Sequence, residues 1–142
     1  VINFDIYADI ALCKISNVFH DVSFIQASVS NGLTHKSALQ LLGFPSYRQP
    51  QSSAHTSSCH LTFETERDNK KFFSINTPII GGNSGGPIID SDYKLLGIAS
   101  KGYHGYGEIR NESLMTKSIN VTIMGNNLCS HVSNLQELLK VI

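Results

Sequence analysis

The sequence predicts an all-β protein with one helix at its C-terminal end. Short runs of aliphatic, aromatic and β-branched residues recur at close spacing, and clusters of Gly, Pro, Asn, Asp and Ser separate them. Helical periodicity is confined to the last ten residues. Many strand-length runs at short, regular spacing are typical of a β-barrel or a β-sandwich.

Eight strands are expected in order along the chain. They cover residues 9–15, 22–29, 38–44, 59–66, 71–77, 86–90, 94–100 and 114–124. Within 59–66, Leu61 and Phe63 alternate with polar residues, which predicts that both point to the same apolar face. Turns are expected at 30–32, 66–70, 90–93 and 102–107, and the polar stretch 45–58 is expected to be a mobile loop.

The expected helix covers residues 133–142. Ser133 is the predicted N-cap, with Gln136 three residues further on. The apolar residues that share one face of this helix are Leu135, Leu138, Leu139 and Ile142.

Composition limits the class of protein and its partners. The chain has 142 residues, of which 41% are hydrophobic and 15% charged, which is typical of one globular domain. Eleven basic residues balance eleven acidic ones, so nucleic acid is not an expected partner. No apolar run approaches the roughly 20 residues of a membrane span, and no signal-peptide pattern is visible. The compartment stays open.

The three cysteines are Cys13, Cys59 and Cys129. An odd number at long spacing argues against a disulfide framework, and weakly against a disulfide-rich secreted protein. The same spacing argues against a zinc site, and no metal or cofactor is expected. We expect buried or partly buried free thiols.

A glycine-rich stretch, "IIGGNSGGPIID" (79–90), surrounds a single serine, Ser84. Four glycines in this stretch allow positive φ angles and a close approach of the backbone to a ligand. Successive N–H groups in such a turn converge on one point, which is what acyl transfer requires where a carbonyl oxygen becomes negative. The alternative interpretation is an ordinary tight turn, for which glycine is the common residue.

Three motifs together resemble the trypsin-like serine peptidases. "GNSGGP" followed by "KLLGIAS" resembles their nucleophile segment, most closely in the compact bacterial-type branch of HtrA-like and glutamyl-endopeptidase-like enzymes. "ADIALCKI" resembles the segment that carries the catalytic aspartate, and "LLGFPS" (41–46) resembles the turn that opens the second barrel. The resemblance implies a double β-barrel. Residues 1–34 would be the end of the first barrel and the linker, and residues 35–142 the complete second barrel with its helix.

The resemblance also implies roles for individual residues. Ser84 would be the nucleophile, the N–H groups of Gly82 and Ser84 would form the oxyanion hole, and Asp9 would orient a catalytic histidine. Residues on the strand expected to pair with the substrate backbone are Ala99, Ser100, Lys101 and Gly102.

The primary specificity pocket would have Pro78 and Ile79 on one wall and Ala99 and Gly102 on the other. No acid lies at its base and no histidine replaces Ala99, so we expect a small or medium uncharged substrate side chain. His104 is a candidate pocket contact. Asn83 replaces an aspartate of zymogen-type relatives, which implies a site that needs no inserted N-terminal amine.

The catalytic histidine is the missing part of the pattern. None precedes Asp9, and the six histidines of the chain (His20, His35, His55, His60, His104 and His131) lie elsewhere. We therefore expect a peptidase whose histidine comes from an N-terminal segment or chain that packs on strand 9–15, with a polypeptide as substrate. The alternatives are an inactive peptidase-like module that binds extended peptides along 99–102, and a viral-type processing peptidase of the same fold.

Overall fold

A computed structural model of the chain describes residues 1–15, 23, 25–27, 34–35, 37–45, 53–100 and 127–140. Several predictions lie outside these residues: the strand at 114–124, the turns at 30–32 and 102–107, His20, His104, Lys101 and Gly102. No helix in the described part of the chain is long and apolar enough to cross a membrane.

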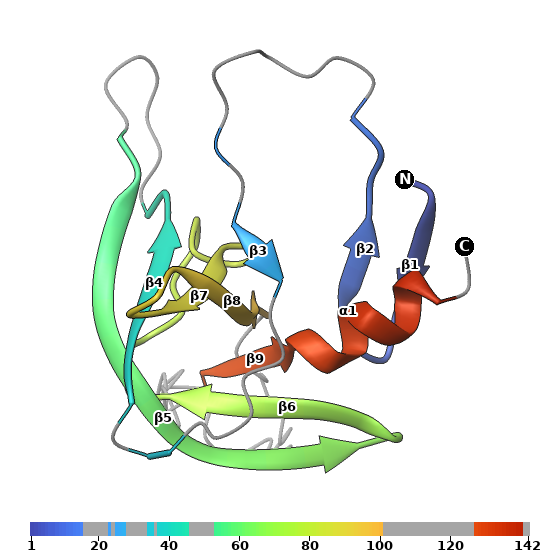
Figure 1. Cartoon of the computed structure of the whole chain (residues 1–142). Helices are drawn as coiled ribbons and strands as arrows, with labels where there is room; N and C mark the ends of the chain where they lie inside the picture. Colours follow the sequence, from blue (N-terminus) through green and yellow to red (C-terminus); the bar gives the residue numbers. More distant parts are fainter. Residues whose placement is uncertain are drawn as a thin grey trace, which may run out of the picture.

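The described elements run from β1 to α1 (Figure 1). They are β1 (Asn3–Asp5), β2 (Ile10–Leu12), β3 (Gln26–Ala27), β4 (Ala38–Gly43), β5 (His55–Arg67), β6 (Lys70–Ile75), β7 (Pro87–Asp90), β8 (Lys94–Ala99), β9 (Leu128–His131) and α1 (Val132–Leu139). Among them, β7, β4, β5, β6, β9 and β8 pair in that order, and β8 pairs back with β7. All of these pairings are antiparallel, so the six strands close a barrel. The predicted all-β fold with a C-terminal helix is confirmed.

Strands β5 and β6 form the longest hairpin of the barrel. Asp68 and Asn69 connect them, with φ angles of 50° and 59°. Two consecutive residues with positive φ are the requirement of a type I′ turn, whose twist matches that of the two strands. The β5–β6 turn lies below α1 and β1 in Figure 1, and Lys70 is the first residue of β6 after it.

The N-terminal half of β5 corrects the prediction of a mobile loop over residues 45–58. Residues 55–58 belong to β5 and pair with β4, for example Ser57 with Leu41. Thr56 and Ser58 face outward, whereas Ser57 is half-buried on the same side of the strand as Cys59. All four residues are polar, so composition does not distinguish this part of β5 from a loop.

A β-bulge corrects the predicted face of Phe63. Leu61 pairs with Ile75 but Phe63 pairs with Ser74, so β5 contains one extra residue at this point. An inserted residue reverses the alternation beyond it. Leu61 therefore points into the core, whereas Phe63 is 37% exposed.

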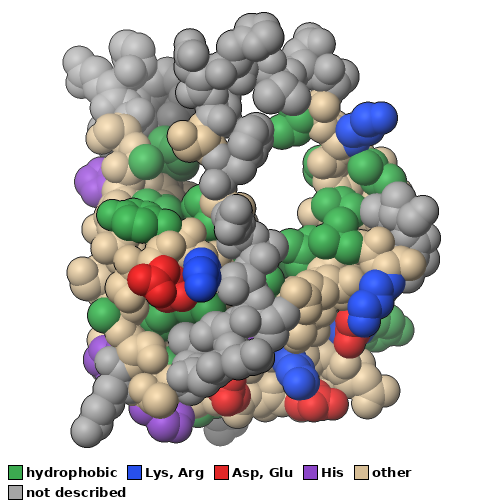
Figure 2. Space-filling model, in the orientation of Figure 1, with side chains coloured by type: hydrophobic (Ala, Val, Ile, Leu, Met, Phe, Trp, Pro, Cys, Tyr) green, Lys and Arg blue, Asp and Glu red, His purple; other side chains and the backbone are tan. Residues whose placement is uncertain are grey.

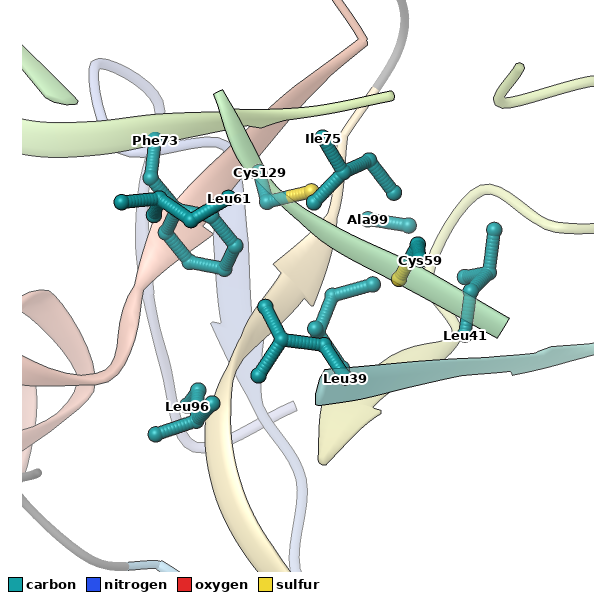
Figure 3. Close-up of a cluster of buried hydrophobic side chains, with 10 residues drawn as sticks. Leu39, Leu41, Cys59, Leu61, Phe73, Ile75, Leu96, Ala99 and Cys129 are labelled. Carbon is teal, nitrogen blue, oxygen red and sulfur yellow. The ribbon is translucent and has the colours of Figure 1, made fainter. Parts of the chain in front are cut away.

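The barrel interior is filled by aliphatic and aromatic side chains from every wall (Figure 3). The cluster consists of Leu39, Leu41, Cys59, Leu61, Phe73, Ile75, Ile88, Leu96, Ala99 and Cys129. All three cysteines are free thiols. Burial is confirmed for Cys59 and Cys129, but Cys13 is exposed because it follows the short strand β2, away from the barrel core.

Helix α1 begins at Val132, one residue before the predicted range 133–142. Its N-cap is His131 rather than Ser133: the His131 Nδ1 accepts the N–H of Ser133 at 3.1 Å. The imidazole also lies edge-on against the Phe73 ring, 6.1 Å away between centroids. Ser133 is instead inside the first turn of the helix.

A buried asparagine fixes the same helix to the barrel. Asn134 Oδ1 accepts the N–H of Lys71 at 3.1 Å, and its Nδ2 donates to the Lys71 carbonyl at 2.7 Å. The amide therefore pairs with β6 as a neighbouring strand would, and the start of α1 is held at one end of the barrel.

Strands β1 and β2 form a separate hairpin that rests on α1 (Figure 1). A second apolar cluster joins them: Ala8, Ile10 and Leu138, with Leu12, Ile98 and Leu135 at its margin. Many apolar side chains of this hairpin remain exposed, and green surface is visible along it in Figure 2. They include Ile2, Phe4, Ile6 and Tyr7.

Candidate active site

The serine turn lies between the loop after β6 and the start of β7. Ser84 is exposed, while the preceding Asn83 is 5% exposed. Two hydrogen bonds close the turn: Asn83 N–H donates to the Ile80 carbonyl and Gly86 N–H donates to the Asn83 carbonyl, both at 2.9 Å. The serine hydroxyl therefore stands at the outside of a compact, internally bonded turn.

The turn uses its N–H groups selectively. Those of Asn83, Gly85 and Gly86 donate to carbonyls of the barrel or of the turn itself. Among hydrogen bonds between described residues, none uses the N–H of Gly81, Gly82 or Ser84. The donors of Gly82 and Ser84 are those that the resemblance implies for an oxyanion hole.

Gly82 is the position where this backbone path requires glycine. Its φ is +96°, and its carbonyl accepts the N–H of Phe44 at 2.9 Å. A Cβ there would lie 2.1 Å from the Phe44 carbonyl oxygen. The turn is thus packed directly on the residue that follows β4, within the predicted 41–46 segment. Gly85 also has positive φ, and Gly81 and Gly86 do not.

Asp9 ends the turn between β1 and β2. Its φ is +54°, a left-handed conformation that aspartate tolerates better than most residues. The residue is exposed, and its Oδ2 accepts a hydrogen bond from Ser100 Oγ at 2.5 Å. Ser100 itself is buried and directly follows β8.

The end of β8 connects the aspartate with the serine turn. Gly85 N–H donates to the Ala99 carbonyl at 2.7 Å, and Ala99 N–H donates to the Gly86 carbonyl at 2.8 Å. The next residue, Ser100, holds Asp9. Asp9 and Gly85, which are 76 positions apart in sequence, are therefore bonded to two consecutive residues, Ser100 and Ala99.

The expected pocket walls are described in part. Ile79 is partly buried against the barrel core, Pro78 is exposed, and Ala99 is fully buried at the end of β8. Lys101 and Gly102, expected to pair with substrate beyond Ser100, lie outside the described residues.

Asn127 is a site residue that the sequence analysis missed. Its Oδ1 accepts the N–H of Ile79 at 3.1 Å and its Nδ2 donates to the Ile75 carbonyl at 3.2 Å. It thus holds the loop that leads from β6 to the serine turn. In sequence it is one of two asparagines after a glycine, a pattern that indicates only a turn, since its partners lie about 50 residues away.

Asn83 is packed beneath the serine turn. A Cβ on Gly43 would lie 2.4 Å from Asn83 Oδ1, so the asparagine amide lies against the end of β4. Val1 is exposed. The neutral side chain of Asn83 is therefore buried, and no cationic group among the described residues is paired with it.

The described histidines are His35, His55, His60 and His131. His131 is engaged at the helix N-cap, and burial lowers its pKa, to which Lys71 adds while Glu64 opposes. None of the four forms a hydrogen bond or an ion pair with Asp9 or Ser84 among the described contacts. Within the same residues, no group of acidic, histidine or cysteine side chains is arranged to hold a metal ion.

The closed antiparallel barrel with its terminal helix places this chain among the trypsin-like barrel folds, the class that the sequence motifs imply. A model described as trypsin-like peptidase domain matches residues 1–98, which include β1 to β7, all of β8 except Ala99, and both Asp9 and Ser84. That is more than half of the chain, and the chain belongs to the trypsin-like peptidase family. A search of the curated proteins found no match.

Proposed function

We propose that the protein is a serine endopeptidase in which Ser84 is the nucleophile. One observation carries the proposal: consecutive residues at the end of β8 bind the serine turn and Asp9, through Ala99 and Ser100. A binding module has no chemical need for this link, whereas a triad needs its hydroxyl and carboxylate on either side of one imidazole.

The histidine of this proposed triad comes from a segment outside residues 1–142. Asp9 is exposed, and among described residues no hydrogen bond uses its Oδ1, so this oxygen is available to the imidazole. The imidazole takes the proton of the Ser84 hydroxyl while the serine oxygen attacks the scissile carbonyl. The same imidazole then protonates the leaving amine, and water hydrolyses the acyl-enzyme.

The N–H groups of Gly82 and Ser84 act as the oxyanion hole in this mechanism. Their lack of a partner among described residues supports the assignment, since a developing alkoxide needs donors that are already in place and unoccupied. Each such donor is worth about 3 kcal/mol of barrier lowering in serine peptidases.

We further assign the protein to the compact branch that includes HtrA-like and glutamyl-endopeptidase-like enzymes. The buried, neutral Asn83 beside Gly43 supports this, since it needs no inserted ammonium group. Pro78, Ile79 and Ala99 present no charge, so the substrate side chain is small or medium and uncharged. We also propose that Lys101 and Gly102, which lie outside the described residues, pair with the substrate backbone.

A fluorophosphonate probe on the full-length gene product tests the proposal. We expect one covalent adduct on Ser84, located by peptide mass spectrometry. The Ser84→Ala variant should lose it, and Asp9→Asn should slow it by orders of magnitude because the imidazole is then held in the wrong tautomer. A full-length protein that stays unlabelled at Ser84 contradicts the proposal and favours a peptide-binding module.

A further inference from the structure

A single lysine at the tip of the β5–β6 hairpin joins three elements that are distant in sequence. Lys70 Nζ lies 3.0 Å from Asp5 Oδ2 in β1 and 2.9 Å from Glu137 Oε2 in α1. The side chains of Lys70 and Asp5 are only 20% and 16% exposed, whereas that of Glu137 is 55% exposed. The Lys70–Asp5 pair is therefore the shielded one, and shielded pairs interact more strongly than exposed ones.

The other oxygen of Asp5 organises the turn that ends at Asp9. Asp5 Oδ1 accepts the N–H of Tyr7 at 2.9 Å and the N–H of Ala8 at 3.0 Å. Ala8 is fully buried, and the next residue is Asp9 with its left-handed φ. One carboxylate thus links the barrel, through Lys70, to the backbone that sets the direction of Asp9.

This link matters because the β1–β2 hairpin has little else to hold it. Its ladder contains three residue pairs, and a two-stranded sheet of that size is marginal alone. Its other described ties to the barrel and α1 are the small apolar cluster around Leu138, an Asn3 amide contact at 3.5 Å, and the Ser100–Asp9 bond itself.

We propose that Lys70 and Asp5 are positioning residues for the catalytic carboxylate, clamping the turn at Ile6–Asp9 so that Asp9 meets Ser100 and the imidazole. The inference rests on the proposed function. Charge supports it: partial burial works to raise the pKa of Asp5, but hydrogen bonds from Ala8 and Lys70 and the Lys70 charge outweigh this and lower it. The carboxylate form, which accepts all three bonds, is therefore the favoured one.

The test compares Lys70→Gln with Lys71→Gln in the full-length protein. Lys71 is the adjacent residue of the same strand, exposed and without an ion pair among the described contacts, so it controls for the loss of one charge. With a fluorophosphonate probe we expect Lys70→Gln to lower the maximal inactivation rate of Ser84 about tenfold, with the half-saturating probe concentration unchanged. Lys71→Gln and Glu137→Gln should stay within about twofold of the wild type, and Lys70→Arg should restore most of the rate.

The pH profile separates positioning from a loss of folded protein. A carboxylate aligned with an imidazolium raises the histidine pKa, so a displaced Asp9 should move the acid limb of the inactivation rate to lower pH. A merely unstable variant would lose rate at every pH without moving that limb. Equal rates and equal acid limbs for Lys70→Gln and Lys71→Gln would overturn the inference.

Amide hydrogen exchange keeps this inference separate from the proposed function. If the wild-type protein does not label at Ser84, the peptidase assignment fails, but the clamp is still decided by exchange at Tyr7 and Ala8. Lys70→Gln should speed exchange of these two amides at least tenfold relative to Lys71→Gln. Unchanged exchange contradicts the clamp whatever the activity.

Discussion

At the scale of single residues, the serine turn depends on one backbone conformation. Gly82 combines a φ of +96° with a carbonyl oxygen of Phe44 in the place where a side chain would begin. The atoms that a Cβ would meet belong to the main chain, so no change of side-chain rotamer could relieve the clash. The proposed role of Ser84 and the packing of the turn on the end of β4 therefore both require glycine at position 82.

Replacing Gly82 by alanine should disrupt both the packing of the serine turn on β4 and the reactivity of Ser84. We expect a loss of about 2–4 kcal/mol in unfolding free energy, from left-handed strain and the backbone contact together, and loss of fluorophosphonate labelling. Urea denaturation of Gly82→Ala beside Gly81→Ala measures this. A Cβ at Gly81 meets no atom within 4 Å, so that control should stay within about 1 kcal/mol of the wild type. Equal stability of the two variants would contradict the argument.

The sequence predicts local motifs at the level of single residues, but it does not predict hydrogen bonds between residues that are distant in sequence. The placement of Ser84 in a glycine turn follows from adjacent residues, so the sequence predicts it directly. The Ser100–Asp9 bond spans 91 residues and the Asn127–Ile79 bond spans 48. A hydroxyl or an amide carries no sign of such a partner, which is why Ser100 was predicted only as a substrate-pairing residue and Asn127 not at all.

At the scale of elements, α1 is attached to the barrel by polar contacts at its first turn. His131 caps the helix with a ring nitrogen that must be unprotonated to accept the Ser133 N–H. Burial lowers the His131 pKa below its ordinary value of 6.5. The unfolded chain therefore takes up a proton at a higher pH than the folded chain does.

The stability of the protein should fall as the pH drops through 6.5. Above that value both states carry a neutral His131, and the cap contributes fully. Below it, protons favour the unfolded state until the lower folded pKa is reached. We expect a decrease of about 1 kcal/mol between pH 7.5 and 5.5 from this residue, the usual value of a lost N-cap. Denaturation curves of the wild type and His131→Asn at both pH values measure it.

Asparagine is the informative substitution because it caps a helix without titrating in this range. It loses contact with Phe73, so its stability at pH 7.5 is expected to be lower. The decrease in its unfolding free energy between pH 7.5 and 5.5 should nevertheless be smaller than the decrease in the wild type. An equal or steeper decrease in His131→Asn would show that another group is responsible.

The elements also show why strand boundaries were harder to predict than strands. The barrel strands that the structure describes were mostly expected, since each carries an apolar face. The bulge at residues 61–63 and the polar start of β5 were not, because both arise from pairing with β6 and β4. Pairing partners decide register, and register decides which face is buried.

At the scale of the whole molecule, the proposed site is divided between a closed barrel and the separate β1–β2 hairpin. Ser84 and its turn belong to the barrel, and Asp9 belongs to the hairpin. Fold class was predictable because it depends on many apolar residues at once. The relation between the two parts was not, because it depends on a few contacts such as Lys70–Asp5 and Ser100–Asp9.

The filled barrel also encloses two sulfhydryl groups. Burial raises the pKa of Cys59 to about 11 against the opposing effect of a backbone hydrogen bond at Leu41, and burial raises the pKa of Cys129 further. The thiolate, not the thiol, attacks an alkylating reagent, so neither buried cysteine should react in the native state. Iodoacetamide should modify Cys59 and Cys129 at one common rate, because both become accessible only when the barrel opens. This rate should rise with the concentration of urea. Selective modification of either at native conditions would contradict this.

These two sulfurs come from β5 and β9, on different walls of the same interior. Chemical trapping of them consequently times the opening of the barrel as a whole. A variant that detaches only the N-terminal hairpin would leave the alkylation rate of both cysteines unchanged. A variant that weakens the core would raise that rate for both cysteines together.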